Sequence, residues 1–226
     1  LRGTPGQLLV NPKGKETTLS IRATLLSKLE GLSKLKDKEE RPFSIRDFVE
    51  EESDRNLFIS LPRADHLEGA KNLAATWINV AILALMNQRE DFDRRVWFLI
   101  DELPSLGRIP ALVDAVTRIR KYGGCMVATM QTISQLDQVY GYHDKETLLG
   151  NFNTKVAFRA TDIKTAEYYA KLMGQREHRR MQENISYGAH QMRDGVSFNE
   201  TERLDQIILP SEIMGLPERA CYVRLP

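Results

Sequence analysis

Two adjacent carboxylates, Asp101 and Glu102, directly follow an apolar run from Val96 to Ile100. A continuous apolar run with β-branched and aromatic residues predicts a strand that is buried on both faces at the centre of a parallel sheet. Such a strand delivers the residues after it to the carboxyl edge of the sheet, where α/β proteins bind ligands. The two acids are therefore expected at a ligand-binding edge.

This arrangement resembles a Walker B element. In P-loop NTPases the first acid of that element helps to hold the Mg²⁺ ion that bridges the nucleotide phosphates. In ATPases of the RecA and AAA+ type the second acid polarises the attacking water. On this interpretation Asp101 helps to hold the metal ion, Glu102 is catalytic, and the reaction is hydrolysis of a nucleoside triphosphate. The alternative is a strand-end acidic pair that only caps the next element.

The phosphate-binding loop that usually accompanies such a strand follows the pattern G-x-x-x-x-G-K-[ST]. The nearest approach lies before Thr17, where Leu9 stands in place of the first glycine and Glu16 in place of the Ser or Thr after the lysine. That segment is more typical of a solvated turn. No residue of this chain is therefore assigned to cradle the phosphates, and we expect the chain alone to be inactive as an ATPase.

Two further side chains are candidates for the same chemistry. Gln131 follows a second predicted strand, and beside Asp101 its amide can contact the γ-phosphate or orient water. Arg120 lies at the end of the intervening helix with Arg118 and Lys121. Cations there complement the helix dipole. The functional alternative is an arginine that reaches a nucleotide in a neighbouring subunit. In that case we expect Arg120 at the rim of the ligand-binding edge, exposed and without a carboxylate partner in its own chain.

The composition limits the classes of protein that fit. The chain has 226 residues with Lys+Arg 32 against Asp+Glu 31, so no global basic charge indicates a nucleic-acid partner. Cys125 and Cys221 each begin an apolar run, which predicts buried free thiols. The longest apolar run is too short to span a bilayer. The first residue is Leu1, which suggests a piece of a longer protein.

The hydrophobic pattern predicts the elements that position these residues. Expected helices cover residues 18–35, 67–88, 109–121, 132–139 and 163–173, and expected strands cover residues 57–61, 96–100, 125–129, 153–159 and 221–225. Residues 174–203, which carry the basic cluster Arg176, His178, Arg179 and Arg180, are expected to form an exposed loop or hairpin. Strands that alternate with helices imply an α/β fold with a mostly parallel sheet covered on both faces.

Four segments together resemble the type IV secretion coupling proteins of conjugation, the TraD/TraG class. They are residues 96–107 (VWFLIDELPSLG), residues 118–131 (RIRKYGGC through ATMQ), residues 186–197 with their SYG and RDGVS patterns, and the Glu202-Arg203 pair with the closing CYVRLP. The likeness extends from about Phe43 to the end of the chain. The order and spacing of the four segments is far more specific than the Walker B pattern alone.

The resemblance implies a RecA-like hexameric motor on the cytoplasmic side of the bacterial inner membrane, which uses ATP and Mg²⁺ to pump single-stranded DNA. It implies relaxase or relaxosome proteins and the secretion channel as partners. Residues 1–45 are then the end of an inserted all-α domain, and residues 46–226 the Walker B half of the motor. Asp101 and Glu102 become the Walker B acids, Gln131 the γ-phosphate-sensing glutamine, and Arg120 the arginine that acts across subunits.

Two other functions remain open. An FtsK/HerA-like DNA translocase shares the motor but not the segment around Tyr187 and Gly188. A non-hydrolysing interaction module would bind relaxosome or effector proteins without turning over nucleotide.

Overall fold

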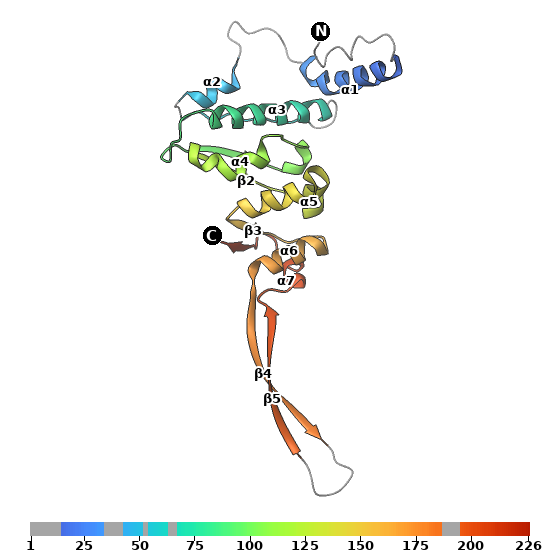
Figure 1. The fold of residues 1–226 in the computed structure, drawn as a ribbon, viewed down its shortest axis with the longest axis vertical. Helices are drawn as coiled ribbons and strands as arrows, with labels where there is room; N and C mark the ends of the chain where they lie inside the picture. Colours follow the sequence, from blue (N-terminus) through green and yellow to red (C-terminus); the bar gives the residue numbers. More distant parts are fainter. Residues whose placement is uncertain (1–14, 34–42, 52–53, 63–66, 187–194) are drawn as a thin grey trace. The chain divides into compact units, whose positions relative to one another are not determined.

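A computed structural model describes residues 15–33, 43–51, 54–62, 67–186 and 195–226 (Figure 1). Contacts within the chain divide it into two compact units, which are described separately. The first unit comprises Leu1–Met130 and Gln135–Asn151, and the second comprises Gln131–Ser134 and Phe152–Pro226. The domain boundary predicted near residue 45 falls inside the first unit and stays a prediction.

The first unit contains the predicted central strand and the helices around it. Its elements are α1 (Lys15–Ser33), α2 (Ile45–Glu50), α3 (Leu67–Met86), β1 (Val96–Ile100), the 3-10 helix η2 (Leu103–Leu106), α4 (Leu112–Arg118), the 3-10 helix η3 (Ile119–Tyr122), β2 (Gly124–Ala128) and most of α5 (Ile133–Asn151). Helix α3 packs against α1 and α2 and also against η2, η3 and α4. Its side chains Ile82 and Leu85 are completely buried.

Strands β1 and β2 pair in parallel, with Val96 opposite Gly124 and Ile100 opposite Ala128. This pairing confirms that the two predicted strands are neighbours and that their carboxyl ends share one edge. The prediction that β1 is buried on both faces is wrong, because Trp97 is 61% and Leu99 73% exposed. An apolar run shows that a strand is hydrophobic, but the number of covering layers depends on which other elements pack on it.

The second unit is smaller and contains two antiparallel strand pairs. Its elements are β3 (Lys155–Ala157), α6 (Ile163–Met173), β4 (Gln175–Ser186), β5 (Gly195–Gln206), α7 (Pro210–Met214) and β6 (Tyr222–Arg224). Strand β3 pairs with β6, and β4 pairs with β5 in a long hairpin (Figure 1). Ala166 and Ala170 of α6 pack with Ile213 of α7 to form its core.

Several predicted elements are confirmed and others are corrected. The segment 174–203 forms a hairpin, which was one of the two alternatives. Residues 57–61 form no strand. Helix α5 continues to Asn151, well beyond the predicted end, through a kink at Gly141, where φ is 75°. Both cysteines are free, but Cys221 is exposed and Cys125 only partly buried, so the prediction of buried thiols is wrong.

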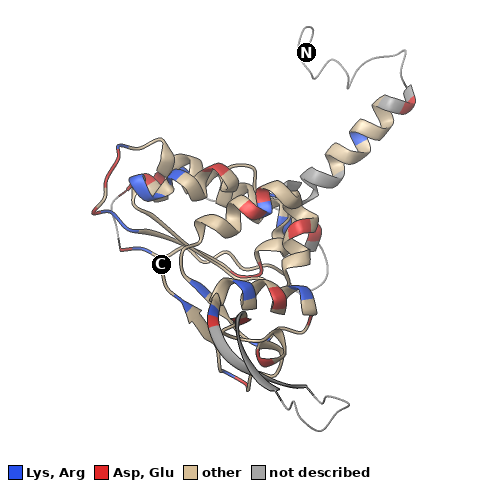
Figure 2. Cartoon of the chain, turned by 60° about the horizontal axis from the view of Figure 1, so that its bottom comes forward, with Lys and Arg blue, Asp and Glu red and all other residues tan. Residues whose placement is uncertain are grey.

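One described helix segment, Glu68–Met86 of α3, is long and apolar enough to cross a membrane by length and composition alone. Core helices of soluble proteins share this length and composition. Acidic and basic residues are interspersed along the described elements, and neither sign gathers over one of them (Figure 2).

Candidate functional site

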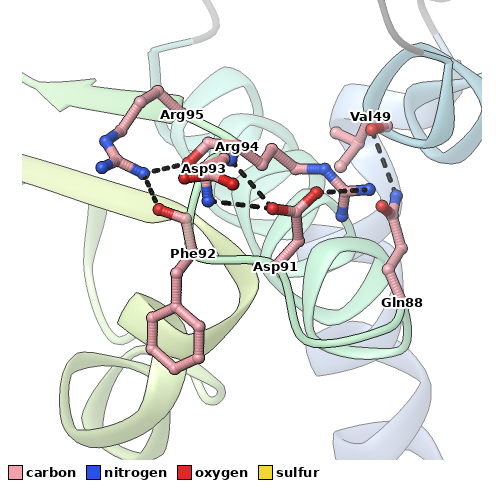
Figure 3. Close-up of polar contacts among 7 residues, drawn as sticks. All are labelled: Val49, Gln88, Asp91, Phe92, Asp93, Arg94 and Arg95. Atoms are coloured by element: carbon pink, nitrogen blue, oxygen red, sulfur yellow. Dashed lines mark hydrogen bonds and ion pairs between the residues drawn. The ribbon is translucent and has the colours of Figure 1, made fainter.

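The turn that leads into β1 is organised by Asp91 (Figure 3). Its Oδ1 accepts hydrogen bonds from the backbone N–H groups of Asp93 at 2.9 Å and Arg94 at 3.1 Å. These backbone bonds lower the pKa of Asp91, because they favour the charged carboxylate. The backbone N–H of Asp91 in turn donates to the carbonyl of Lys121 at 2.8 Å. The turn therefore ties the start of β1 to the helix η3 that precedes β2.

Gly123 allows the two strands to begin side by side. It has φ +79°, and a Cβ atom there would lie 2.5 Å from the carbonyl oxygen of Arg94. Its own carbonyl accepts from the N–H of Val96 at 2.9 Å. Only glycine combines this left-handed backbone with so close an approach. The register at the amino ends of β1 and β2 depends on this contact.

At the opposite, carboxyl end of β1, the chain turns sharply at Glu102. Glu102 has φ 50° and ψ 57°, a left-handed conformation that costs a non-glycine residue about 1–3 kcal/mol. The turn lets Leu103, Pro104 and Leu106 of η2 enter the core while Asp101 remains exposed at the sheet edge. A strained acidic residue next to an exposed carboxylate is a feature that clusters at functional sites.

The ends of β1 and β2 are joined through Thr129. Its hydroxyl donates to Oδ1 of Asp101 at 2.6 Å and accepts from the N–H of Glu102 at 2.8 Å. Its backbone N–H donates to Ile100 at 3.0 Å, and its carbonyl accepts from Leu103 at 2.9 Å. The two acids are therefore held at the edge that the sequence predicts.

The donor set at this edge fits a magnesium ion that also binds phosphates. Mg²⁺ is held in such sites by one or two carboxylates together with substrate phosphates and water. Asp101 presents an exposed carboxylate, and Oε1 of Glu102 is shielded from solvent with no hydrogen-bond partner among the described residues. A buried acceptor without a donor is unfavourable, and such unsatisfied groups are rare outside functional sites. Within the described ranges no three or more His, Cys, Asp or Glu side chains form a metal-binding group.

Gln131 lies three residues beyond the end of β2 and is exposed. It belongs to the second unit, in the short segment Gln131–Ser134. That segment is fixed by Thr165, whose hydroxyl accepts from the N–H of Ile133 at 3.0 Å. Thr129, two residues earlier in the chain, bonds to both acids. The γ-phosphate role of Gln131 stays a prediction.

Arg120 lies in η3, just before β2 begins, and so at the amino end of the strand pair. The expectation that Arg120 lies at the same edge as the acids is wrong, because the helix returns the chain to the start of β2. Arg120 is exposed, and its guanidinium has no hydrogen bond or ion pair with any residue that the structure describes. By contrast, Arg118 pairs with Asp114, and Lys121 pairs with Glu90 at 3.7 Å.

The basic cluster of residues 176–180 lies on strand β4. Arg176 is exposed, and the side chains of the other three cations lie outside the described residues. The segment around Tyr187 and Gly188 also lies outside them.

Comparisons with known proteins give the fold and the family. The solved structure of the plasmid coupling protein TrwB in complex with the non-hydrolysable ATP analogue ADPNP is 30% identical, with a TM-score of 0.78, and the match covers 99% of this chain and 50% of that one. TrwB in complex with ADP and Mg²⁺ matches with 31% identity and a TM-score of 0.76, over 95% of this chain and 47% of that one. The chain therefore has the RecA-like α/β fold that the sequence predicts.

The sequence model of the type IV secretion-system coupling protein DNA-binding domain matches residues 1–226. The coupling protein TraD of Escherichia coli strain K12 is 38% identical over 232 residues, which cover 100% of this chain and 32% of TraD. The chain belongs to the type IV secretion coupling proteins. It spans about a third of TraD and about half of TrwB.

Sequence reasoning missed the contribution of Thr129. A threonine directly after a strand is ordinary in itself, so residue type gave no signal. The signal is positional: once β2 is paired in parallel with β1, the residue after Ala128 stands beside the residue after Ile100, which is Asp101.

Proposed function

We propose that this chain is the Walker B part of an ATP-driven coupling protein that moves single-stranded DNA into a type IV secretion channel during conjugation. The observation that carries the proposal is the pair Asp101 and Glu102 at the carboxyl edge of the parallel strands, bonded to the end of the neighbouring strand. The family match and the nucleotide complexes of TrwB support it.

Each acid has a distinct part in the proposed reaction. Bound Mg²⁺ would neutralise charge on the nucleotide phosphates, and the exposed carboxylate of Asp101 is placed to hold it. Glu102 would orient the attacking water and accept its proton, because it directly follows Asp101 at the carboxyl end of β1 and is the second acid of the pair. Gln131 would contact the γ-phosphate, and Arg120 would act on the nucleotide of a neighbouring subunit.

The proposed assembly is a homo-hexamer on the cytoplasmic face of the inner membrane. Its partners are relaxase and relaxosome proteins on one side and secretion-channel components on the other. A ring would repeat the same weak DNA contact in every subunit. A chain with a net charge of only +1 could therefore still contribute to binding a nucleic acid. The family match favours this function over an FtsK/HerA-like translocase, and the strained acidic turn favours hydrolysis over a passive interaction module.

The proposal is tested with the full-length protein. We expect ATP hydrolysis that single-stranded DNA stimulates, and we expect Glu102→Gln to abolish both that hydrolysis and plasmid transfer from donor cells. Glu167→Gln, on the exposed side of α6, is the matched control and should leave both unchanged. Wild-type transfer by Glu102→Gln would contradict the proposal.

A further inference from the structure

Thr129 makes hydrogen bonds to four consecutive residues, which run from the end of β1 into η2. Its backbone groups bond to Ile100 and Leu103, as the backbone of any residue at this position can. Its side chain bonds to the two acids between them, Asp101 and Glu102. Only these two side-chain bonds depend on the identity of the residue.

The hydroxyl of Thr129 is both a hydrogen-bond donor and a hydrogen-bond acceptor. A hydroxyl has one proton to donate and lone pairs to accept with. The proton goes to the carboxylate of Asp101 at 2.6 Å, which is the short distance of a charge-assisted bond, and a lone pair accepts from Glu102 N–H at 2.8 Å. One atom therefore orients the carboxylate of Asp101 and supports the backbone of Glu102.

The support at Glu102 matters because its conformation is unfavourable by itself. A non-glycine residue at φ 50° persists only where the surrounding structure holds it. Without a partner for its N–H, this turn is free to relax and to move the shielded carboxylate oxygen of Glu102. Groups that orient ligand or catalytic side chains from behind typically change metal affinity or activity about 10–100-fold when they are removed.

We propose that Thr129 is a positioning residue that sets the geometry of both acids through its hydroxyl. This inference rests on the proposed hydrolysis of ATP. Thr129 touches neither nucleotide nor water in this proposal. It acts through Asp101 and Glu102.

The test compares Thr129→Val, which keeps the branched shape, with Thr129→Ser, which keeps the hydroxyl, in the full-length protein. Thr129→Ala also removes the hydroxyl and serves as a second variant if valine does not fold. The first measurement is amide hydrogen exchange of the nucleotide-free protein, resolved to single residues by mass spectrometry. We expect faster exchange at Glu102 in the valine variant and unchanged exchange at Leu103, whose acceptor is a backbone carbonyl.

The second measurement is ATP hydrolysis, with the Mg²⁺ dependence of nucleotide binding followed separately by equilibrium titration. Thr129→Val should lower kcat about 10–100-fold and raise the Mg²⁺ concentration needed for binding, and Thr129→Ser should restore both. Thr76→Val is the matched control, because its hydroxyl donates to the carbonyl of Asn72 at 2.7 Å on helix α3, outside the site.

Wild-type hydrolysis in Thr129→Val, or unchanged exchange at Glu102, would overturn this inference. A serine variant as slow as the valine variant would also overturn it, because the methyl group and not the hydroxyl would then matter. If Glu102→Gln hydrolyses ATP as fast as the wild type, the proposed function fails and this inference fails with it. If Glu102→Gln is slow while Thr129→Val is not, only this inference fails.

Discussion

Asp101 and Glu102 are adjacent in the chain but differ in their surroundings, and this difference predicts a division of roles. Asp101 is exposed and bonded by a hydroxyl, whereas Glu102 has a shielded oxygen without a donor among the described residues. In the full-length protein we expect Glu102→Gln to bind Mg²⁺-ATP normally and to lose about 10²–10⁴ in hydrolysis rate, because only the group that orients water is lost. Asp101→Ala should also weaken Mg²⁺-nucleotide binding.

Equilibrium titration with a fluorescent nucleotide, at several Mg²⁺ concentrations, measures this difference. The control is binding of the same nucleotide without Mg²⁺, which both variants should leave equal. Identical losses of Mg²⁺-dependent binding in the two variants would argue against separate roles for the two acids.

At the residue scale the sequence located the acids well but not the group that orients them. Apolar residues followed by Asp101 and Glu102 form a pattern of adjacent residues. Such a pattern can be recognised without knowing which elements pack together. The bond from Thr129 joins residues 28 positions apart in the chain, so it depends on which strands pair. The edge at which Arg120 lies likewise depends on where the chain between the two strands returns to the sheet, and its predicted edge was wrong.

At the scale of elements, the register of β1 against β2 depends on Gly123. A Cβ atom at this position would overlap the carbonyl oxygen of Arg94. The residue that carries it would also have to adopt φ +79°, which is unfavourable for most residues other than glycine. We expect Gly123→Ala to lower the free energy of unfolding by about 2–5 kcal/mol, from the left-handed backbone and from steric overlap together. Chemical denaturation of the 226-residue chain measures the change.

Gly123→Asn separates the two causes. Asparagine tolerates the left-handed conformation, so it should recover stability if the backbone angle alone were responsible. Because the overlap with Arg94 remains, we expect Gly123→Asn to be nearly as unstable as Gly123→Ala. Recovery to wild-type stability would show that the close approach does not restrict this position.

The turn before β1 should make the stability of the chain depend on pH through Asp91. Its pKa lies below the ordinary value of 3.8 in the folded protein, because the N–H groups of Asp93 and Arg94 favour the carboxylate. The unfolded chain therefore binds a proton first as the pH falls. The stabilisation is present above pH 3.8 and is lost as the pH falls through the lower, folded pKa.

Denaturant midpoints measured between neutral pH and about pH 2.5 test this expectation. Asp91→Asn should lower the midpoint at neutral pH, and the difference from the wild type should shrink in acid. Asp93→Asn is the control, because the structure uses the backbone N–H of Asp93 in this turn and not its carboxylate. A difference that stays constant from neutral to acid pH would mean that Asp91 acts here without its charge.

Predicted elements agree with the structure where local signals delimit them and differ where tertiary contacts do. Helix α6 was predicted over 163–173 and is found over Ile163–Met173, because Asp162 caps it and Gly174 ends it. The residues 57–61 have the composition of a strand, yet a strand also needs a partner, and none pairs with them among the described elements. Helix α5 passes its predicted end because tertiary packing buries Leu148 and Leu149 beyond the kink.

At the scale of the whole molecule, the unpaired guanidinium of Arg120 is the feature that bears on assembly. Its neighbours Arg118 and Lys121 have acidic partners, as cations on a helix end commonly do. Arg120 is exposed, lies away from the acids of its own chain, and pairs with no residue that the structure describes. Exposure and the lack of a partner among the described residues are the features that agree with a role in a neighbouring subunit, whereas the edge at which Arg120 lies differs from the expectation.

Arg120→Ala should therefore remove hydrolysis by the full-length protein while leaving its own Mg²⁺-ATP binding intact. Loss of an arginine that acts in trans costs on the order of 10³–10⁵ in kcat, whereas loss of a helix-end charge costs about 0.3–1 kcal/mol of stability. Arg118→Ala is the matched control, because it removes a neighbouring cation that already has a partner in Asp114.

Mixing Arg120→Ala subunits with Glu102→Gln subunits tests the trans role directly. Each variant is expected to be inactive alone, because every interface in its ring lacks the same group. In a mixed ring, some interfaces combine an intact Glu102 from one subunit with an intact Arg120 from its neighbour, so hydrolysis should partly return. ATP turnover across a series of mixing ratios should pass through a maximum between the two pure variants. Rings shown by mass spectrometry to contain both subunits, yet without recovered turnover at any ratio, would rule out the trans assignment of Arg120.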